Sequence, residues 1–152
     1  MKNLGKNVKF KICGIKNENE AGKVAKLKID FLGIIFAESK RQVSPQMAQK
    51  IAKIAHQNGK KAVGVFAGIT KFKILEICDF VKLDAVQIYD NINFENELKN
   101  RNIELWQVVS IKNEIPNMNN YKFDKILFDY KGKKIGGNGI SWDFSLLENF
   151  KK

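Results

Sequence analysis

The sequence predicts an α/β fold in which parallel strands alternate with helices. Short apolar runs recur along the chain, and most are followed by a segment with helical periodicity. Several runs are apolar throughout, which is typical of strands buried on both faces of a parallel sheet. The chain holds about six strand–helix units, so it forms either an open doubly wound sheet or an arc of a (β/α)8 barrel.

The first half of the chain contains the clearest helix signals. The segment after the first strand begins with acidic residues and ends with lysines, an order that complements the helix dipole. Before the second helix, Ser44 is placed to cap the N-terminus, Pro45 fits the first helical position and Gly59 ends the helix. The predicted strands are residues 8–13, 30–36 and 61–66, followed by helices at 18–28, 45–58 and 70–80.

The second half repeats the alternation with weaker signals. Residues 112–121 predict only a weak helix or a loop, and a glycine-rich loop is expected at 129–141. The predicted strands are 83–89, 103–109 and 123–128, and the predicted helices are 94–101 and 142–150.

Length and composition describe an ordinary globular protein. The chain has 152 residues, of which 44% are hydrophobic and 28% charged, so we expect residues 1–152 to form a single domain. The longest apolar run, 62–69, is far shorter than the roughly 20 residues that cross a bilayer. The N-terminus has no apolar signal-peptide region. We therefore expect a cytoplasmic protein with no membrane partner.

The cysteine and histidine content argues against a metal site or a disulfide framework. Cys13 and Cys78 have no metal-ligand spacing, and His56 is the only histidine. Cys78 lies on the apolar face of a predicted helix, so we interpret it as part of the core. His56 is near the end of a predicted helix and is interpreted as a surface residue.

The net charge of +11 is concentrated in the first part of the chain. Residues 1–61 hold 14 of the 27 Lys and Arg side chains but only 4 of the 16 Asp and Glu side chains. This distribution either steers anionic ligands or is a solvated surface. Only Arg41 and Arg101 are arginines, and no basic helix, aromatic RNA-binding strand or zinc spacing is present. We therefore expect no nucleic-acid partner.

Candidate functional residues lie where the predicted strands end, because α/β folds place their sites at the carboxyl ends of parallel strands. Cys13 ends the first strand and is either a reactive thiol or a small buried residue. Asp129 follows the sixth and is either a general acid or a turn residue. Arg41 follows the second and is either an anion clamp or an exposed cation. Gln87 either points into the mouth of a barrel or bonds a neighbouring strand.

The loop after the sixth strand is rich in glycine. Gly136, Gly137 and Gly139 precede a predicted helix, and glycines let backbone N–H groups approach a phosphate. A mobile loop can have the same composition, so both interpretations stay open.

Taken in order, these motifs resemble those of the phosphoribosylanthranilate isomerase family. The similar segments are 11–14 (KICG), 32–36 (LGIIF), 39–45 (SKRQVSP), 63–66 (VGVF), 83–87 (LDAVQ), and 127–129 with 136–139 and 142–144. The resemblance is collinear over nearly the whole chain and implies the (β/α)8 TIM-barrel fold. It also implies an Amadori rearrangement of an anionic phosphosugar in tryptophan biosynthesis, without a cofactor or metal, by a monomer or homodimer.

The resemblance assigns roles to individual residues. It makes Cys13 the general base and Asp129 the general acid, and it places Arg41 on the anthranilate part of the substrate. Lys11 and Gln87 are further candidates for substrate binding, and a cation such as Lys11 can favour a thiolate at Cys13. The three glycines of the loop are the phosphate-binding candidates.

The chain departs from the family pattern in three places. Tyr89 stands where the family often has histidine, and Ile140 where a lysine is common. The last two βα units, with part of the phosphate site, are absent, so we expect this sequence to be part of a longer gene product. The alternatives are a truncated, non-catalytic barrel that assembles through its open edges, and a related phosphosugar isomerase with a broader substrate range.

Overall fold

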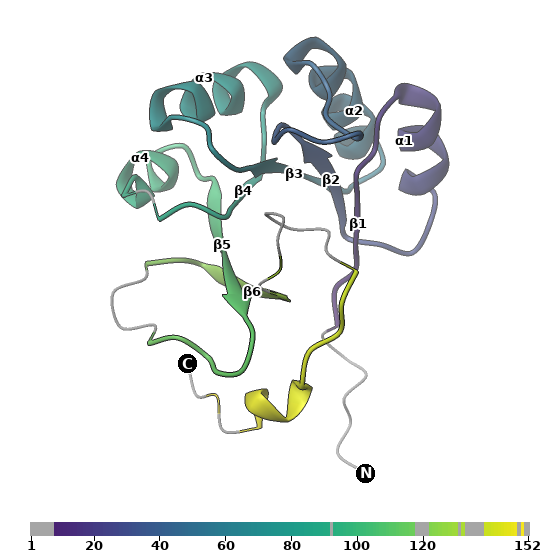
Figure 1. The fold of residues 1–152 in the computed structure, drawn as a ribbon. Coiled ribbons are helices and arrows are strands. Elements are labelled where there is room, and N and C mark those ends of the chain that lie inside the picture. The colour runs from purple at the N-terminus through teal and green to yellow at the C-terminus, as the bar shows by residue number, and fades with distance from the viewer. Residues whose placement is uncertain are drawn as a thin grey trace.

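A computed structural model of the protein describes residues 8–91, 93–117, 122–130, 132, 139–148 and 150, and shows one parallel sheet (Figure 1). Its strands pair in chain order, each with its sequence neighbour. A doubly wound sheet reverses its strand order at a switch point, so this order identifies an arc of a (β/α)8 barrel. The strands are β1 (Lys11–Cys13), β2 (Phe31–Ile35), β3 (Lys61–Phe66), β4 (Ala85–Ile88), β5 (Glu104–Ile111) and β6 (Lys125–Tyr130).

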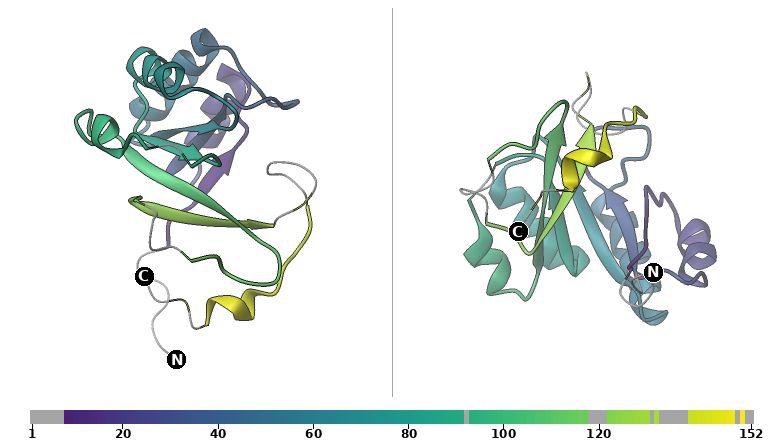
Figure 2. Two further views of the ribbon diagram at one scale, coloured as in Figure 1. Left: turned by 60° about the vertical axis from the view of Figure 1, so that its left-hand side comes forward. Right: turned by 90° about the horizontal axis from the view of Figure 1, so that it is seen from below.

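Four α-helices cover the outer side of the sheet, as the two rotated views show (Figure 2). They are α1 (Glu18–Ala25), α2 (Pro45–Gln57), α3 (Lys71–Val81) and α4 (Glu95–Lys99). The main apolar core lies between these helices and the outward side chains of the strands. Among the described residues, no helix has the length and apolar character needed to cross a membrane.

The predicted signals around α2 are confirmed. Ser44 Oγ accepts a hydrogen bond of 3.3 Å from the backbone N–H of Met47, and Pro45 is the first helical residue. Gly59 has φ +67°, the left-handed conformation in which glycine ends a helix without steric cost. The strand predicted at 61–66 matches β3 at both ends.

One helix prediction in the second half is not met. In place of the helix at 142–150 there is a single 3₁₀ turn, η1 (Phe144–Leu147), none of whose residues is buried. Without an apolar face against the core, a short segment has too little packing to hold a longer helix. After β5, residues 112–117 form a loop, and 118–121 lie outside the described residues.

The apolar residues of the last segment contact β6 through their aromatic rings. The rings of Trp142 and Phe150 contact the ring of Phe128 on β6 edge to face, with centroids 6.2 and 5.1 Å apart. Trp142 also contacts Phe144, at 4.7 Å. The segment after β6 therefore returns to that strand through its aromatic rings and not through a helix face.

A second apolar cluster lies on the inner side of the sheet and shows that the sheet curves. Phe31 on β2 meets Trp106 on β5 edge to face, with ring centroids 4.8 Å apart, although two strands lie between them. Val63, Ala85 and Leu127 complete this cluster. A flat sheet holds neighbouring strands about 4.8 Å apart, so side chains on two strands with two others between them touch only if the sheet is rolled.

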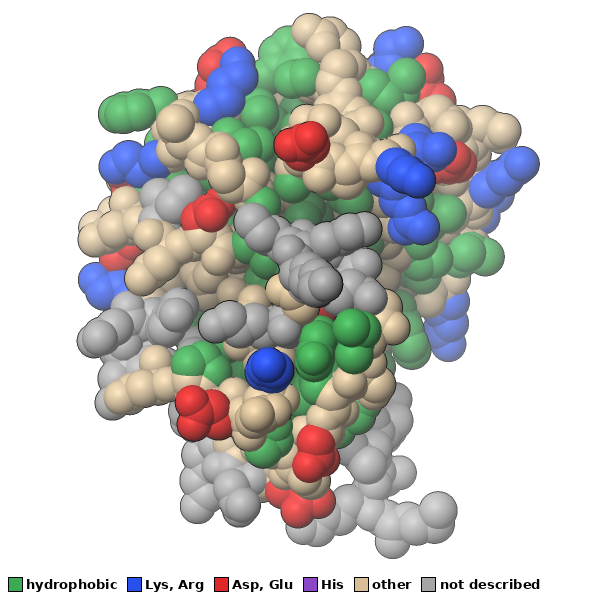
Figure 3. All heavy atoms as spheres, in the orientation of Figure 1, with side chains coloured by type: hydrophobic (Ala, Val, Ile, Leu, Met, Phe, Trp, Pro, Cys, Tyr) green, Lys and Arg blue, Asp and Glu red, His purple; other side chains and the backbone are tan. Residues whose placement is uncertain are grey.

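Exposed cations are spread over the surface. On the face shown in Figure 3, Lys and Arg side chains lie mainly toward the rim, close to Asp and Glu side chains. Ion pairs of this kind join Lys50 to Glu18 at 3.2 Å and Lys73 to Glu76 at 2.9 Å. This part of the positive charge fits a solvated surface.

Candidate active site

The side chains singled out from the sequence gather at the carboxyl ends of the strands, on the inner side of the arc. Cys13 is the last residue of β1, and Asp129 is the second-last of β6. Gln87 lies near the end of β4, and Tyr89 follows that strand at once. Because side chains alternate along a strand, Lys11 and Cys13 share one face of β1, and Gln87 points to the same inner side.

The Cys13 thiol occupies space that the absence of a side chain at Gly33 provides. The two residues are paired in the register of β1 and β2. A Cβ atom added to Gly33 would lie 2.6 Å from Cys13 Sγ and 2.9 Å from Cys13 Cα. Cys13 is a free, partly exposed cysteine, so its sulfur is accessible to a ligand in the arc.

Arg41 reaches the end of β1 from the loop after β2. The guanidinium side chain crosses the backbone of Gly14, where an added Cβ atom would lie 2.6 Å from Arg41 Cδ. Gly14 also has φ +87°, which favours glycine for a second reason. The loop is held in place because Val43 N–H donates to the carbonyl of Ile35 at 3.0 Å. A cation is thereby fixed next to the residue that follows Cys13.

Lys11 and Gln87 are joined across the inside of the arc. Lys11 Nζ donates to Gln87 Oε1 at 2.7 Å, a bond between β1 and β4. Gln87 is 6% exposed, and it is one of only two buried polar residues in the described part of the chain. The bond satisfies a buried amide oxygen and links the first strand of the arc to the fourth.

The Tyr89 hydroxyl contacts Asp129, the predicted general acid. It donates a long hydrogen bond of 3.4 Å to Asp129 Oδ2. Burial, followed by the negative charges of Asp129 and of an ionised Cys13, raises the pKa of Tyr89 to about 12. The phenol is therefore neutral and carries its proton at physiological pH.

The Asp129 carboxyl group is oriented by its own strand. Oδ1 accepts a 2.8 Å hydrogen bond from the backbone N–H of Tyr130, which leaves Oδ2 as the oxygen that faces Tyr89. The side chain is half-buried. One oxygen of Asp129 is therefore held by the backbone, and the other is only weakly bonded.

The sequence and the fold of known proteins identify the family of this chain. A family model described as N-(5'-phosphoribosyl)anthranilate isomerase matches residues 10–152. The chain belongs to this family. The isomerase of Campylobacter jejuni is 44% identical over 147 residues, which are 95% of this chain and 74% of that protein. The chain thus spans about three quarters of the length of this relative.

Solved structures of phosphoribosylanthranilate isomerases have the same fold. Monomers of the dimeric isomerase from Thermotoga maritima match with a TM-score of 0.67 and 28% identity, over 93% of this chain and 69% of that one. A second isomerase was solved in complex with reduced 1-(o-carboxyphenylamino)-1-deoxyribulose 5-phosphate. It matches with a TM-score of 0.54 and 30% identity, over 70% of this chain and 56% of that one.

Cys78 and His56, which we interpreted as non-catalytic, lie where the sequence predicts. Cys78 is 1% exposed in the core, and burial, followed by the charge of Asp79, raises the pKa of its thiol to about 12. His56 Nε2 lies 2.8 Å from Asp84 Oδ2, at the amino end of β4 and so away from the strand ends that carry the site.

The phosphate-binding candidates of the isomerase are only partly visible. Gly136 and Gly137 lie outside the described residues. Gly139 is exposed and has φ +64°, and a Cβ atom added to it would meet nothing within 4 Å. Its positive φ is a conformation that favours glycine.

Tyr89 is the site residue that sequence reasoning did not include. It stood out only as a departure from the family pattern, in place of a histidine. The sequence did hold one signal for it. Side chains two residues apart on a strand share a face, so Tyr89 is expected on the same side as Gln87. Its closeness to Asp129, by contrast, depends on the curvature that brings β4 and β6 together.

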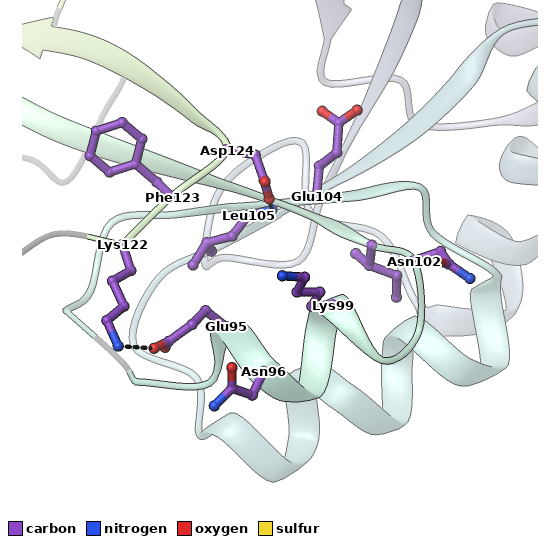
Figure 4. Close-up of a pocket in the computed structure, with 10 residues that line it drawn as sticks. Glu95, Asn96, Lys99, Asn102, Glu104, Leu105, Lys122, Phe123 and Asp124 are labelled. Atoms are coloured by element: carbon purple, nitrogen blue, oxygen red, sulfur yellow. Dashed lines mark hydrogen bonds and ion pairs between the residues drawn. The ribbon is translucent and has the colours of Figure 1, made fainter. Parts of the chain in front are cut away.

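A cavity of about 530 Å³ lies at the opposite end of the strands (Figure 4). It is bounded by α4, the start of β5 and the residues just before β6, and the ion pair of Lys122 with Glu95, 2.9 Å long, crosses its edge. The amino ends of barrel strands serve stability more than chemistry. Within the described ranges, no group of three or more His, Cys, Asp or Glu side chains could hold a metal ion.

Proposed function

We propose that this protein isomerises N-(5-phosphoribosyl)anthranilate to 1-(2-carboxyphenylamino)-1-deoxyribulose 5-phosphate in the tryptophan pathway, in the cytoplasm. The observation that carries the proposal is the grouping of a thiol, a carboxyl group and an arginine at one end of the arc. Cys13 and Asp129 both lie close enough to the Tyr89 hydroxyl to influence its charge. In a chain of this family, that pair supplies a base and an acid on opposite walls of one site.

Asp129 is the proposed general acid. Its Oδ2 transfers a proton to the ribose ring oxygen, the bond from that oxygen to C1′ breaks, and the anthranilate nitrogen forms a protonated Schiff base with C1′. The 2.8 Å bond from Tyr130 N–H to Oδ1 supports this role, because it stabilises the carboxylate that remains.

Cys13 is the proposed general base. Its thiolate takes the proton from C2′, the electrons of that bond neutralise the Schiff base, and the resulting enolamine tautomerises to the ketone. Arg41, which lies over the neighbouring Gly14, supports the site because its guanidinium can hold the carboxylate of the anthranilate ring.

Lys11, Gln87 and the glycine loop are the proposed binding groups. Lys11 Nζ and the Gln87 amide form one polar unit on the inner wall, which can bond the ribose hydroxyls. The backbone of Gly136, Gly137 and Gly139 is the proposed contact for the 5-phosphate.

Turnover is tested through the loss of anthranilate-type fluorescence on addition of substrate. The change Cys13→Ala should lower kcat by at least about 10²-fold, because the base that removes the C2′ proton is gone. Cys78→Ala is the matched control: it removes the other thiol, lowers stability through a small cavity, and should leave kcat unchanged. A Cys13→Ala variant that is folded and as active as the parent would contradict the assignment.

A second candidate is a non-catalytic assembly module. It is favoured by the two edges of the sheet, since β1 and β6 each pair with a single strand among the described residues. An open edge offers unpaired backbone groups to another chain. A mass that rises with concentration in light scattering, together with no turnover by the parent protein, would favour this candidate over the isomerase.

A further inference from the structure

The carboxyl end of β5 carries an exposed serine beside the proposed general acid. Ser110 is paired with Asp129 in the register of β5 and β6, and neighbouring strands lie about 4.8 Å apart. Ser110 is also the one exposed residue of β5, whose other side chains are buried or partly buried. A polar side chain therefore stands at the end of the strands where (β/α)8 barrels carry their sites.

Alternation along the strands sends the Ser110 side chain to the inner side of the arc. The Trp106 ring belongs to the inner apolar cluster, and Ser110 is four residues further along the same strand, so the two side chains share a face. Leu127 packs against that cluster, and Asp129 is two residues further along β6. The serine hydroxyl and the carboxyl group therefore lie on neighbouring strands of the same inner wall.

The surroundings of Asp129 leave one direction open for a ligand. Because β5 lies between β4 and β6, the hydrogen bond from Tyr89 to Asp129 crosses the inner face of β5. On that face Val108 is 5% exposed, whereas Ser110, the next inward residue toward the carboxyl end, is exposed. The other carboxyl oxygen, Oδ1, is held by the N–H of Tyr130. A ligand that takes a proton from Oδ2 thus approaches from the exposed side, next to Ser110.

The Ser110 hydroxyl is available to such a ligand. Within the described part of the chain, it makes no hydrogen bond of its own. A serine hydroxyl turns freely about its Cβ–Oγ bond, so it can direct its proton toward an oxygen that comes close to Asp129.

We propose, on the basis of the proposed isomerase function, that Ser110 donates a hydrogen bond to the ribose ring oxygen while Asp129 protonates that oxygen. As the bond from the ring oxygen to C1′ breaks, its electron pair stays on the oxygen, the Asp129 proton joins it, and a hydroxyl group results. Ser110 keeps its own proton throughout. It stabilises the negative charge that grows on the oxygen before the proton transfer is complete.

A hydrogen bond of this kind acts mainly in the transition state. The ring oxygen of the bound substrate is an ether oxygen, which is a weak acceptor, and it becomes a stronger one as its bond to C1′ breaks. An interaction that strengthens in the transition state raises kcat and has little effect on KM.

The decisive experiment compares Ser110→Thr with Ser110→Val by the fluorescence assay. Both side chains are branched at Cβ, have nearly the same size and suit a strand, so the two variants differ in one hydroxyl. We expect Ser110→Thr to keep most of the parent's kcat and Ser110→Val to be about tenfold slower, with similar KM in both. The pH dependence of kcat should have the same shape in the two variants, because the hydroxyl acts on the substrate and not on Asp129.

Thr70→Val is the matched control. It removes another exposed hydroxyl, at the N-terminus of α3, where the threonine side chain makes no capping hydrogen bond. This change should leave kcat as it is in the parent protein.

Three results would overturn the role of Ser110 while the isomerase function stands. Equal kcat values in Ser110→Thr and Ser110→Val would show that the hydroxyl does nothing. A loss that appears only in KM would place the hydroxyl on another part of the substrate, and a changed pH profile would place its action on Asp129.

Folding and parent activity complete the test. If either variant does not fold by circular dichroism, Ser110→Ala decides: kcat about tenfold below the parent supports the role, and a parent-like kcat overturns it. If the parent protein shows no turnover, the proposed function itself fails, and the role of Ser110 fails with it.

Discussion

Acidic side chains make different hydrogen bonds at the two ends of the strands. At the amino end, an aspartate directly precedes β2, β4 and β6, and each accepts a short hydrogen bond from a backbone N–H at the start of the preceding strand. These bonds are Phe10 N–H to Asp30 at 2.8 Å, Ala62 N–H to Asp84 at 2.7 Å, and Leu105 N–H to Asp124 at 2.7 Å.

At the carboxyl end, Asp129 differs from these three aspartates, because one of its oxygens has only a weak hydrogen bond. Among the described residues, Asp129 accepts hydrogen bonds from the N–H of the next residue and, at 3.4 Å, from the hydroxyl of Tyr89. The Cys13 thiol lies beside Gly33 and the Arg41 side chain lies over Gly14. Because these glycines have no side chains, both groups have space. The amino end therefore uses its carboxylates to fix the strands, whereas the carboxyl end holds the carboxyl group and the thiol that we propose as acid and base.

The largest expected effect comes from removing one aspartate at each end of β6. Asp129→Ala should lower kcat by about 10²–10⁴-fold with little change in stability, because a half-buried general acid is lost. Asp124→Ala should leave kcat nearly unchanged and lower the free energy of unfolding by about 1–3 kcal/mol, because the N–H of Leu105 loses its partner.

Fluorescence turnover and urea unfolding measure the two effects in the same pair of proteins. Equal losses of kcat in both variants would remove the distinction between the ends of the strand.

A smaller effect is expected from filling the space beside Cys13. In Gly33→Ala the new Cβ atom would come within 2.9 Å of the Cys13 backbone, so the thiol must shift and kcat should fall about 10–100-fold. Gly22→Ala is the matched control, since a Cβ atom on α1 would meet nothing within 4 Å. It should leave kcat unchanged and stabilise the helix by about 0.5–1 kcal/mol. Unchanged turnover in Gly33→Ala would show that the position of the thiol is not critical.

Local signals predicted much of this fold. Ser44, Pro45 and Gly59 set the limits of α2 through capping that involves only neighbouring residues, so the sequence was sufficient there. Cys13 and Asp129 were found because parallel strands bring their carboxyl ends to one edge, a rule that needs only the strand boundaries.

The remaining features depend on contacts between distant segments. The helix expected at 142–150 is a short 3₁₀ turn because its aromatic residues contact Phe128 on β6, a contact that no local pattern encodes. Tyr89 approaches Asp129 only because the sheet curves. The same curvature brings Phe31 to Trp106, although two strands lie between them, so the closeness of Tyr89 to Asp129 became visible only in three dimensions.

The smallest expected effect concerns Glu104 and the lysines around it at the amino end of β5. It should appear in the pH dependence of stability and not in turnover. Although partial burial opposes it, hydrogen bonds from Lys125, Trp106 and Lys61 lower the pKa of Glu104 to about 2 from 4.5. A group whose pKa is lower in the folded state stabilises that state above its unfolded pKa. The stabilisation, about 2 kcal/mol, should therefore be complete above about pH 5 and be lost as the pH falls from 4.5 toward 2.

The change Glu104→Gln removes this titration. We expect the unfolding midpoint of the parent protein to fall more steeply than that of Glu104→Gln between pH 5 and about pH 3, while kcat at neutral pH differs little between the two. Parallel curves would mean that the cluster contributes no pH-dependent stability. A large loss of kcat would mean that the amino end reaches the reacting groups, because Glu104 lies at the opposite end of the strands from Cys13 and Asp129.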